Sequence, residues 1–198
     1  MLHPFLEANQ IEDGWDDAVS GCLAGPVVAA AVIISPEFDT RGRRDSKVLS
    51  ADKRERLRIY IEKNALAWGV SSTCNEVIDN INILNASFDA MHKAIDLLDI
   101  SPDLILVDGN RFKPYPRIPH KCIVKGDATF ASIAAASILA KTYRDEMMRQ
   151  YHERYPDYGW HQNKGYPTND HRQAIALYGE TPLHRRSFNL RARQLKMF

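Results

Sequence analysis

Residues 27–34 read Val-Val-Ala-Ala-Ala-Val-Ile-Ile, an apolar run with no polar interruption. A strand with one face in water alternates apolar and polar residues, whereas a strand covered on both faces does not. Residues 66–73 and 104–107 have the same character, and residues 122–124 form a shorter fourth run. Residues 14–21 are more polar and stand where a hairpin partner of residues 27–34 would lie. These runs predict a sheet whose strands are covered on both sides.

Between and after these runs the apolar residues recur at helical spacing. Ser50 is a candidate N-cap, and the helix expected after it carries Leu57, Tyr60, Ile61 and Ala65 before Gly69 closes the segment. A second helix face is marked by Leu84, Phe88, Met91, Ile95 and Leu98. Residues 130–155 contain neither Gly nor Pro, and their first part consists mainly of small side chains. Because small side chains allow a close approach, this helix is expected to lie against the sheet.

Strands that alternate with helices and are followed by a helical tail predict an α/β fold, with a mixed central β-sheet flanked by helices and a helical C-terminal region. The 198 residues fit one domain, 1–198, in which residues from about 165–198 form a helical and loop extension of the same unit. With 44% hydrophobic and 26% charged residues, the composition is that of an ordinary soluble domain.

The cysteines and the apolar runs bear on where the chain works. Cys22, Cys74 and Cys122 are odd in number and lack Cys-x-x-Cys spacing, which favours reduced thiols over disulfides or a zinc site. Residues 1–9 lack a basic segment followed by an apolar one, and no apolar run approaches the ~20 residues of a membrane span. The chain is expected to be cytoplasmic and monomeric.

The net charge of +1 does not by itself indicate a polyanionic partner. Its distribution is uneven, since residues 141–198 hold eleven Lys/Arg and six Asp/Glu, and a second basic cluster runs through residues 41–58. Such segments can contact phosphates. A solvated helix face explains them as well, and on charge alone it is the favoured interpretation.

Four aspartates could carry chemistry, and one of them, Asp108, stands at the end of an apolar run, where an α/β sheet places its ligand sites. Asp108 directly follows the run of residues 104–107, and Asp127 lies just before the small-residue helix, where it could act as an N-cap. Asp16 and Asp17 are adjacent in the first polar strand, so both can serve one site only if that strand bends or ends there. Singly, each fits a turn, a cap or an exposed position. Together, oxygen ligands without a His/Cys cluster indicate Mg²⁺ or Mn²⁺, and two such ions would suit phosphodiester hydrolysis.

A series of sequence blocks resembles the ribonuclease HII family and appears in that family's order over roughly residues 12 to 188. The blocks are Cys22-Leu23-Ala24-Gly25-Pro26 with the apolar run after it, Asp45-Ser46-Lys47, Ile81-Asn82-Ile83-Leu84, Leu106-Val107-Asp108-Gly109-Asn110, Lys125-Gly126-Asp127, residues 134–141, Arg144-Asp145, Lys164-Gly165-Tyr166-Pro167-Thr168 and His184-Arg185-Arg186-Ser187-Phe188. One block would be weak support, whereas so many in register are strong support.

The resemblance implies a ribonuclease H-like fold and endonucleolytic hydrolysis of the RNA strand of RNA–DNA hybrids. The implied activity extends to single ribonucleotides embedded in duplex DNA and leaves 3′-hydroxyl and 5′-phosphate ends. It also implies that Asp16, Asp17, Asp108 and Asp127 are the catalytic residues that bind Mn²⁺ or Mg²⁺. Tyr166 matches the residue that stacks on the sugar beside the scissile phosphate, and Gly21 belongs to the loop that reads the 2′-hydroxyl. The candidates for contacts to phosphate, or for support of the site wall, are Lys47, Lys141, Arg144, Arg185 and Arg186.

One stretch departs from the family pattern, in which the first aspartate is followed by Glu, a small residue or two, and then Gly-Arg-Gly. Here Asp17 replaces the glutamate and is shorter by one methylene, so a ligand set at about 2.0–2.1 Å for Mg²⁺ requires a backbone shift. Val19 is β-branched where a glycine is usual, and Ser20 lacks the arginine charge. Trp15 is also bulkier than expected. These differences support the hypothesis that the fold is retained while activity or ribonucleotide specificity is weakened.

Other functions remain open at this level. A catalytically silent module that binds hybrid on the same fold is the main alternative. A different metal-dependent phosphotransferase fits the aspartates, but it does not fit the Lys-Gly-Tyr-Pro and His-Arg-Arg-Ser-Phe blocks. A nucleotide-binding enzyme is disfavoured, because the chain has neither G-x-x-x-x-G-K-[ST] nor G-x-G-x-x-G after a strand.

Overall fold

The architecture is taken from a computed structural model, which describes residues 2–3, 6, 12–18, 21–39 and 49–190, with the backbone alone for 12–18. A five-stranded sheet in the order β3-β2-β1-β4-β5 forms its centre. The strands are β1 (Glu12–Ala18), β2 (Val27–Ile33), β3 (Ala67–Thr73), β4 (Leu104–Asp108) and β5 (His120–Ile123). The first three strands pair antiparallel, whereas β4 runs parallel to both β1 and β5. The predicted mixed sheet is confirmed.

Five α-helices and two short 3₁₀ turns accompany the sheet in this part of the chain. They are α1 (Ala51–Asn64), α2 (Asn75–Asp96), α3 (Ala131–Arg154), α4 (Trp160–Asn163) and α5 (Asn169–Tyr178), with η2 (Gly126–Ala128) and η3 (Pro156–Tyr158). Ser50 caps α1, because its hydroxyl accepts a hydrogen bond from the Lys53 N–H. The small-residue helix is also confirmed, and it begins one residue later than expected, after Phe130.

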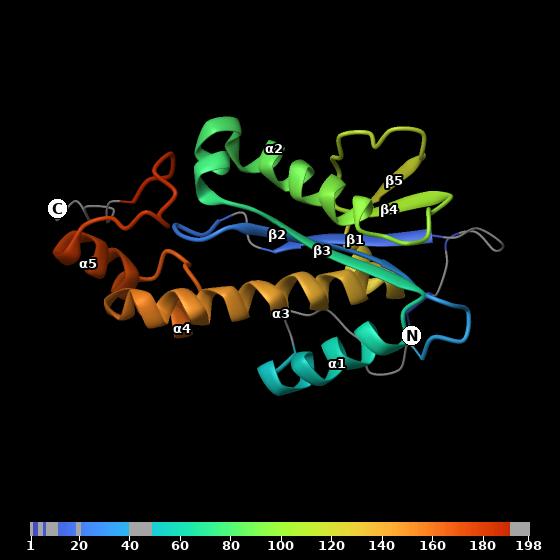
Figure 1. Cartoon of the computed structure of the whole chain (residues 1–198), viewed down its shortest axis with the longest axis horizontal. Helices are drawn as coiled ribbons and strands as arrows, with labels where there is room; N and C mark the ends of the chain where they lie inside the picture. The colour runs from blue at the N-terminus through green and yellow to red at the C-terminus, as the bar shows by residue number, and fades with distance from the viewer. Residues whose placement is uncertain (1, 4–5, 7–11, 19–20, 40–48, 191–198) are drawn as a thin grey trace, which may run out of the picture.

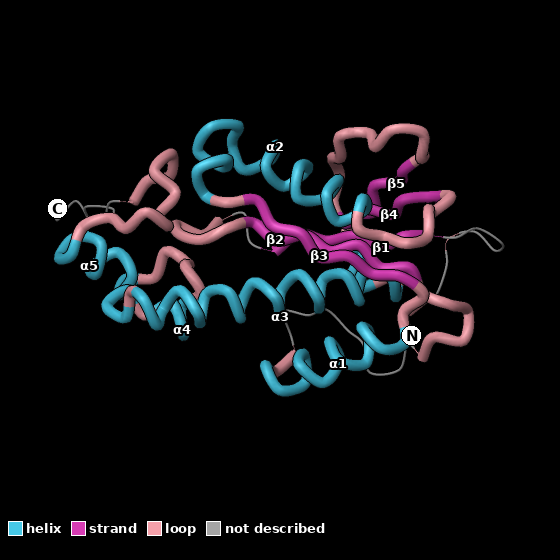
Figure 2. The backbone as a smooth tube through the Cα atoms, viewed as in Figure 1, coloured by secondary structure: helices cyan, strands magenta, loops and turns pink. Residues whose placement is uncertain are grey.

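Helices cover both faces of the sheet, α2 on one side and α3 with α1 on the other (Figures 1 and 2). β2 is buried along its whole length, which explains why its sequence does not alternate. Alternate β2 residues face different cores, so Ala29 packs with the α2 side and Ala30 with the α3 side. Residues 131–140 of α3 are all buried, as the small side chains predicted.

The C-terminal segments pack against the far end of α3, where α4 and α5 lie together (Figure 1). Their core consists of Leu23, Ala24, Met148, Tyr158, Trp160, Ala174, Ile175 and Leu190. This cluster includes residues from the connection between β1 and β2, so the C-terminal region is built around the loop that follows the first aspartates. No helix in the described ranges is long and apolar enough to cross a membrane.

Some sequence expectations were wrong in detail. Gly69 was expected to end the first helix, but α1 ends at Asn64, because Ala65 already has an extended conformation. Gly69 lies inside β3. Leu84 was expected on the buried face of α2, but it is 42% exposed. The α2 backbone breaks at Asn82 (φ 66°), two residues before Leu84, so the helical stripe of the later turns does not extend back to it.

Candidate active site

Asp108 is the last residue of β4, which places its carboxylate at the end of a buried strand as predicted. Its Oδ1 accepts a hydrogen bond from the backbone N–H of Gly126 at 2.7 Å. A Cβ at position 126 would lie 2.6 Å from Ile133 Cδ1 and 3.5 Å from Asp108 Oδ1. Glycine at 126 therefore allows the β5–α3 connection to close on Asp108 and to fix one of its oxygens.

Asp127 follows in the 3₁₀ turn η2 and is 5% exposed. The turn starts from Lys125 in the left-handed region (φ 59°). Asp127 is not the N-cap of α3, because the N-cap residue is Phe130 and Asp127 lies in the 3₁₀ turn before it, so the capping interpretation was wrong. Burial of a carboxylate is costly unless charge or hydrogen bonds compensate it. The position is one where a bound cation would stabilise the charged form.

Asp16 and Asp17 belong to β1, of which the structure describes the backbone only. Trp15 pairs with Val107 in the parallel β4, so the next residues, Asp16 and Asp108, lie level at the same end of neighbouring strands. Pairing with β2 continues through Asp17 and Ala18, without the early end of the strand that the sequence allowed for. The register therefore places Asp16 beside Asp108, whereas the directions of both β1 carboxylates lie outside the described residues, as do Val19, Ser20 and Lys47.

Tyr166 sits on a loop that is held against the β1–β2 connection. Lys164 and Gly165 both have positive φ (51° and 85°), and a Cβ at Gly165 would lie 2.6 Å from the Ala24 carbonyl oxygen. The Leu23 N–H donates to the Gly165 carbonyl at 2.8 Å. Tyr166 itself is 41% exposed. The loop thus presents an aromatic ring to solvent and contacts the chain at Leu23, two residues after Gly21. Gly21 is exposed and has nothing within 4 Å of the place of a Cβ.

Arg144 was expected as a phosphate contact or as support for the site wall, and the structure places it in the interior at 0% exposure. Its three guanidinium nitrogens donate to the carbonyls of Pro26 (3.1 Å), Lys164 (2.9 Å) and Ala24 (3.2 Å). Arg185 is equally buried and donates to the carbonyls of Gly25 and Pro26. Both arginines therefore tie the β1–β2 connection to the C-terminal loops. For Arg144, these partners and its burial favour the alternative role of supporting the site wall over contact with phosphate.

The other basic candidates differ in accessibility. Lys141 is ion-paired with Asp145, which Arg54 also approaches at 3.6 Å. Arg58, in the basic cluster of α1, bonds Glu62 (2.8 Å) and Glu146 (2.7 Å). The side chains of Arg54 and Arg58 are only 14% and 17% exposed and pair with acidic residues of α3, so at these two positions the cluster is neither a solvated face nor open to phosphate. The side chain of Arg186 is 72% exposed and lies 3.8 Å from Glu180, so it is open to a phosphate.

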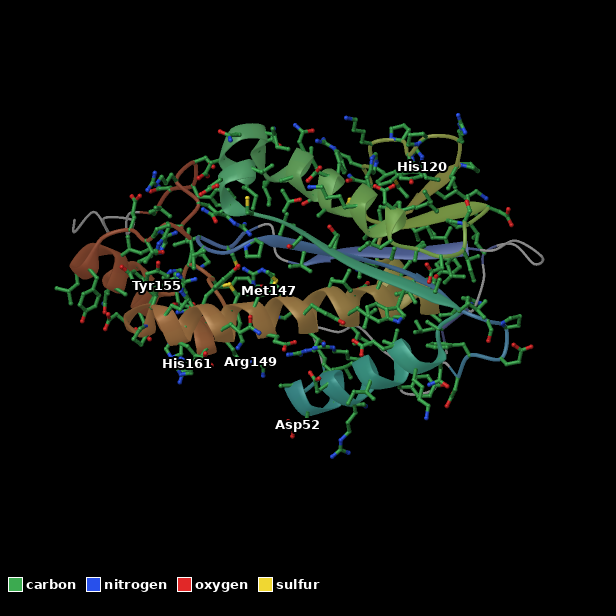
Figure 3. The ribbon with its side chains drawn as sticks, viewed as in Figure 1. Asp52, His120, Met147, Arg149, Tyr155 and His161 are labelled. Atoms are coloured by element: carbon green, nitrogen blue, oxygen red, sulfur yellow. The ribbon has the colours of Figure 1, made fainter. Side chains whose placement is uncertain are left out.

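A groove of about 590 Å³ runs between α1 and the α3–α4 side of the molecule. Arg149 and His161 border it on the α3–α4 side and Asp52 on the α1 side, as Figure 3 shows. Lys164, two residues before Tyr166, also lines the groove, and its ammonium donates to the His161 carbonyl. The groove therefore joins the exposed Arg149 with the partly buried Lys164, which lies next to the tyrosine loop.

Sequence reasoning missed two polar residues of α2, the buried Asn75 and the partly buried Asp79, that hold the 182–187 segment. Asn75 donates to the carbonyls of Pro182 (2.8 Å) and His184 (3.2 Å). Asp79 accepts hydrogen bonds from the backbone of Arg186 and from Ser187. Burial would raise the pKa of the Asp79 carboxyl, but these donors outweigh it and lower that pKa. No local pattern marks them, because each partner is more than 100 residues away.

A pair of buried histidines, His171 and His184, was also missed as a unit. Their Nε2 atoms lie 3.3 Å apart. Burial lowers the pKa of both imidazoles, that of His184 to about 4 with a further contribution from the neighbouring His171. One indication of this pair was present in the sequence, because His184 lies in a block that resembles the family pattern.

Comparison with known proteins identifies the scaffold. The ribonuclease HII family model matches residues 13–191. A ribonuclease HII of Bacteroides thetaiotaomicron is 56% identical over 190 residues, 96% of this chain and 95% of that protein. A ribonuclease HII of Christiangramia forsetii is 57% identical over 184 residues, 93% of each chain.

Solved structures share the fold. The ribonuclease H2 of Pyrococcus horikoshii superposes with a TM-score of 0.77 at 24% identity, covering 90% of this chain and 94% of that one. The ribonuclease HII of Archaeoglobus fulgidus, solved in complex with PCNA, gives 0.74 at 27% identity, with coverage of 95% and 100%. The chain belongs to the ribonuclease HII family, endonuclease hydrolases that act on RNA–DNA hybrids.

Proposed function

We propose that this chain cuts the RNA strand of RNA–DNA hybrids and also single ribonucleotides embedded in duplex DNA, leaving 3′-hydroxyl and 5′-phosphate ends. One observation carries the proposal. Asp108 ends β4 with one oxygen fixed by the Gly126 N–H, the buried Asp127 is the next residue along from Gly126, and the register of β1 sets Asp16 level with Asp108. Three segments that carry acidic residues thus come together at one end of the sheet, which supports a shared site.

The donor set fits a hard divalent cation. Asp16, Asp17, Asp108 and Asp127 are the proposed ligands, and oxygen donors of this kind suit Mg²⁺ or Mn²⁺. When bound, such ions activate the attacking water and offset charge on the leaving oxygen. The described residues contain no cluster of three possible ligands, which is consistent with this set because two of its members lie in β1.

The chain's own residues would orient the metal ligands and the substrate. The Gly126 N–H donates a hydrogen bond to Oδ1 of Asp108 and so fixes the orientation of the carboxylate that would bind the ion. Tyr166, exposed on its pinned loop, is the proposed platform for the sugar beside the scissile phosphate, with Gly21 at the 2′-hydroxyl. Lys47, Lys141 and Arg186 are the proposed phosphate contacts, whereas the buried Arg144 supports the wall of the site.

The test is cleavage of a labelled DNA duplex with one ribonucleotide, and of a full hybrid, with Mn²⁺ and with Mg²⁺. Asp108→Asn should lower the rate by roughly 100-fold or more while hybrid binding persists, since a carboxylate that acts in the transition state contributes on that scale. Asp99→Asn, an exposed carboxylate beyond α2, is the matched control and should be neutral. Binding without product by the parent chain would instead support the silent hybrid-binding module.

The hypothesis of weakened activity stays a prediction, because the comparisons do not indicate impairment and the side chains of Asp17, Val19 and Ser20 lie outside the described residues. Asp17→Glu tests it by restoring the missing methylene. If the shorter side chain of Asp17 limits binding of the ion, this variant should cleave faster than the parent with Mg²⁺. An unchanged or lower rate would show that Asp17 is adequate in this chain.

A further inference from the structure

A buried polar cluster under the tyrosine loop has no part in the proposed chemistry. It consists of Trp160, His171, Thr181 and His184, each no more than 5% exposed, drawn from α4, α5 and the loop after α5. Buried polar groups are stable only when their hydrogen bonds are satisfied, so the positions of the protons follow from the partners.

The partners assign a tautomer to each ring. The Thr181 backbone N–H donates to His184 Nδ1 at 2.9 Å, so a neutral His184 carries its proton on Nε2. The Trp160 indole N–H donates to His171 Nε2 at 3.0 Å, so His171 carries its proton on Nδ1. That Nδ1–H lies 2.9 Å from the Tyr166 carbonyl oxygen and donates to it. The His184 Nε2–H is left facing His171 Nε2 at 3.3 Å.

The two ends of this chain of hydrogen bonds are attached to two different segments, the loop that carries Tyr166 and the connection between β1 and β2. At one end, His171 holds the carbonyl of Tyr166, whose N–H is bonded to the Asn163 carbonyl at 2.8 Å. At the other end, His184 forms an antiparallel bridge with Ala24, in the connection that follows Gly21. The flanking bonds from Arg185 N–H to Leu23 (2.8 Å) and from Gly25 N–H to Leu183 (2.9 Å) fix that segment.

We propose that His171 is a positioning residue, which sets the place of Tyr166 through its Nδ1–H and couples it, through His184, to the loop after β1. The inference rests on the proposed role of Tyr166 as the platform for the sugar. It adds a specific requirement, namely that a donor must stand at Nδ1 of residue 171 for that platform to be aligned.

The surroundings keep the pair neutral. The groups around it are Trp160, the Tyr158 ring from η3, and the cations Arg172 on α5 and Arg185 beside His184. A further proton would have to enter a nitrogen that already accepts a hydrogen bond, beside another imidazole and close to these cations. Burial lowers the pKa of both rings, so the coupling is expected to be constant over neutral pH.

Two substitutions at His171 distinguish the roles of its two ring nitrogens. In His171→Asn the amide nitrogen can stand near the place of Nδ1 and keep a donor for Tyr166, whereas in His171→Gln the amide stands near Nε2 and the Tyr166 donor is lost. We expect His171→Gln to lower kcat on the single-ribonucleotide duplex by about three- to tenfold, the worth of one hydrogen bond, with KM little changed. His171→Asn should retain at least half of the activity.

A cycle with Tyr166→Ala makes the test specific. If His171 acts by placing Tyr166, the His171→Gln penalty should disappear in the Tyr166→Ala background. If His171→Gln instead reduces the amount of folded protein, its penalty should also appear in the Tyr166→Ala background. Additive penalties would overturn the inference while leaving the role of Tyr166 intact. No effect of Tyr166→Ala alone would refute the proposed role of Tyr166, and the inference with it.

A measurement on the parent chain does not depend on activity or on variants that fold. Nitrogen-15 NMR of the imidazoles at neutral pH should show His171 protonated on Nδ1 and His184 on Nε2. Both rings should be neutral at pH 7, and His184 should remain neutral down to about pH 5, in keeping with its pKa of about 4. The opposite tautomer at either residue, or a charged His171 at pH 7, would overturn the inference.

Discussion

Replacement of Arg144 by Met tests whether this arginine is a scaffold residue or a phosphate contact. The side chain is fully buried and its three donors serve carbonyls of Ala24, Pro26 and Lys164 at 2.9–3.2 Å. Loss of a partner for a buried carbonyl costs about 1–3 kcal/mol each. Part of that sum is offset because the guanidinium no longer has to be desolvated, so the expected net destabilisation is about 3–5 kcal/mol.

The assay is thermal and urea unfolding of the parent and of Arg144→Met. For a chain of this size each kcal/mol shifts the midpoint by roughly 2–4 °C, so a fall of about 6–20 °C is expected. Arg186→Met is the matched control, since that side chain is 72% exposed and its ion pair with Glu180 at 3.8 Å contributes at most about 1 kcal/mol. Its midpoint should change by no more than a few degrees.

The reasoning would be refuted if Arg144→Met unfolded within about 1 kcal/mol of the parent. If it also bound hybrid more weakly, with a salt dependence reduced by about one phosphate contact, Arg144 would be a phosphate ligand, as the sequence indicated.

Two further predictions concern the loops around Tyr166. Because the pKa of His184 is about 4 when folded and about 6.5 when unfolded, the unfolded chain binds more protons between these values. The unfolding free energy should therefore be unaffected by this group above pH 7 and fall by about 3 kcal/mol as pH decreases through that window. His184→Gln should lose this pH dependence. Equal slopes of unfolding free energy against pH in the parent and the variant would contradict the prediction. Gly165→Ala places a Cβ 2.6 Å from the Ala24 oxygen at φ 85°, whereas Gly179→Ala has the same strain (φ 81°) and open space. The first should unfold at least about 1 kcal/mol more easily and cleave more slowly than the second, and equal behaviour would show that the loop is not held closely.

The layered fold was readable from the sequence because burial leaves a pattern. β2 and β4 are covered on both faces and read as unbroken apolar runs, and α3 approaches the sheet closely with small residues. The α2 helix was read less well. Its backbone breaks at Asn82 in a left-handed conformation, and Leu84 shortly after it stands in solvent in spite of its spacing.

The candidate site was predictable only in part, for a related reason. Asp108 stood out because a carboxylate at the end of a buried strand is unusual, and the structure places it there. Arg144 and Arg185 are charged, and charge by itself suggests a surface. Their acceptors at residues 24–26 lie more than 100 positions away along the chain. The tautomers of His171 and His184 likewise depend on partners that only the folded chain brings together.

The central claim is that carboxylates at the end of β4 and in η2 carry metal-assisted cleavage at a ribonucleotide. The most direct measurement is gel analysis of a duplex with one ribonucleotide, incubated with Mn²⁺ and either the parent or Asp127→Asn, with the product ends mapped. We expect the parent to give one cut with 3′-hydroxyl and 5′-phosphate ends, and Asp127→Asn to bind the duplex and lose at least about 100-fold in rate. Undiminished cleavage by Asp127→Asn, or the same cut without any divalent ion, would contradict the account.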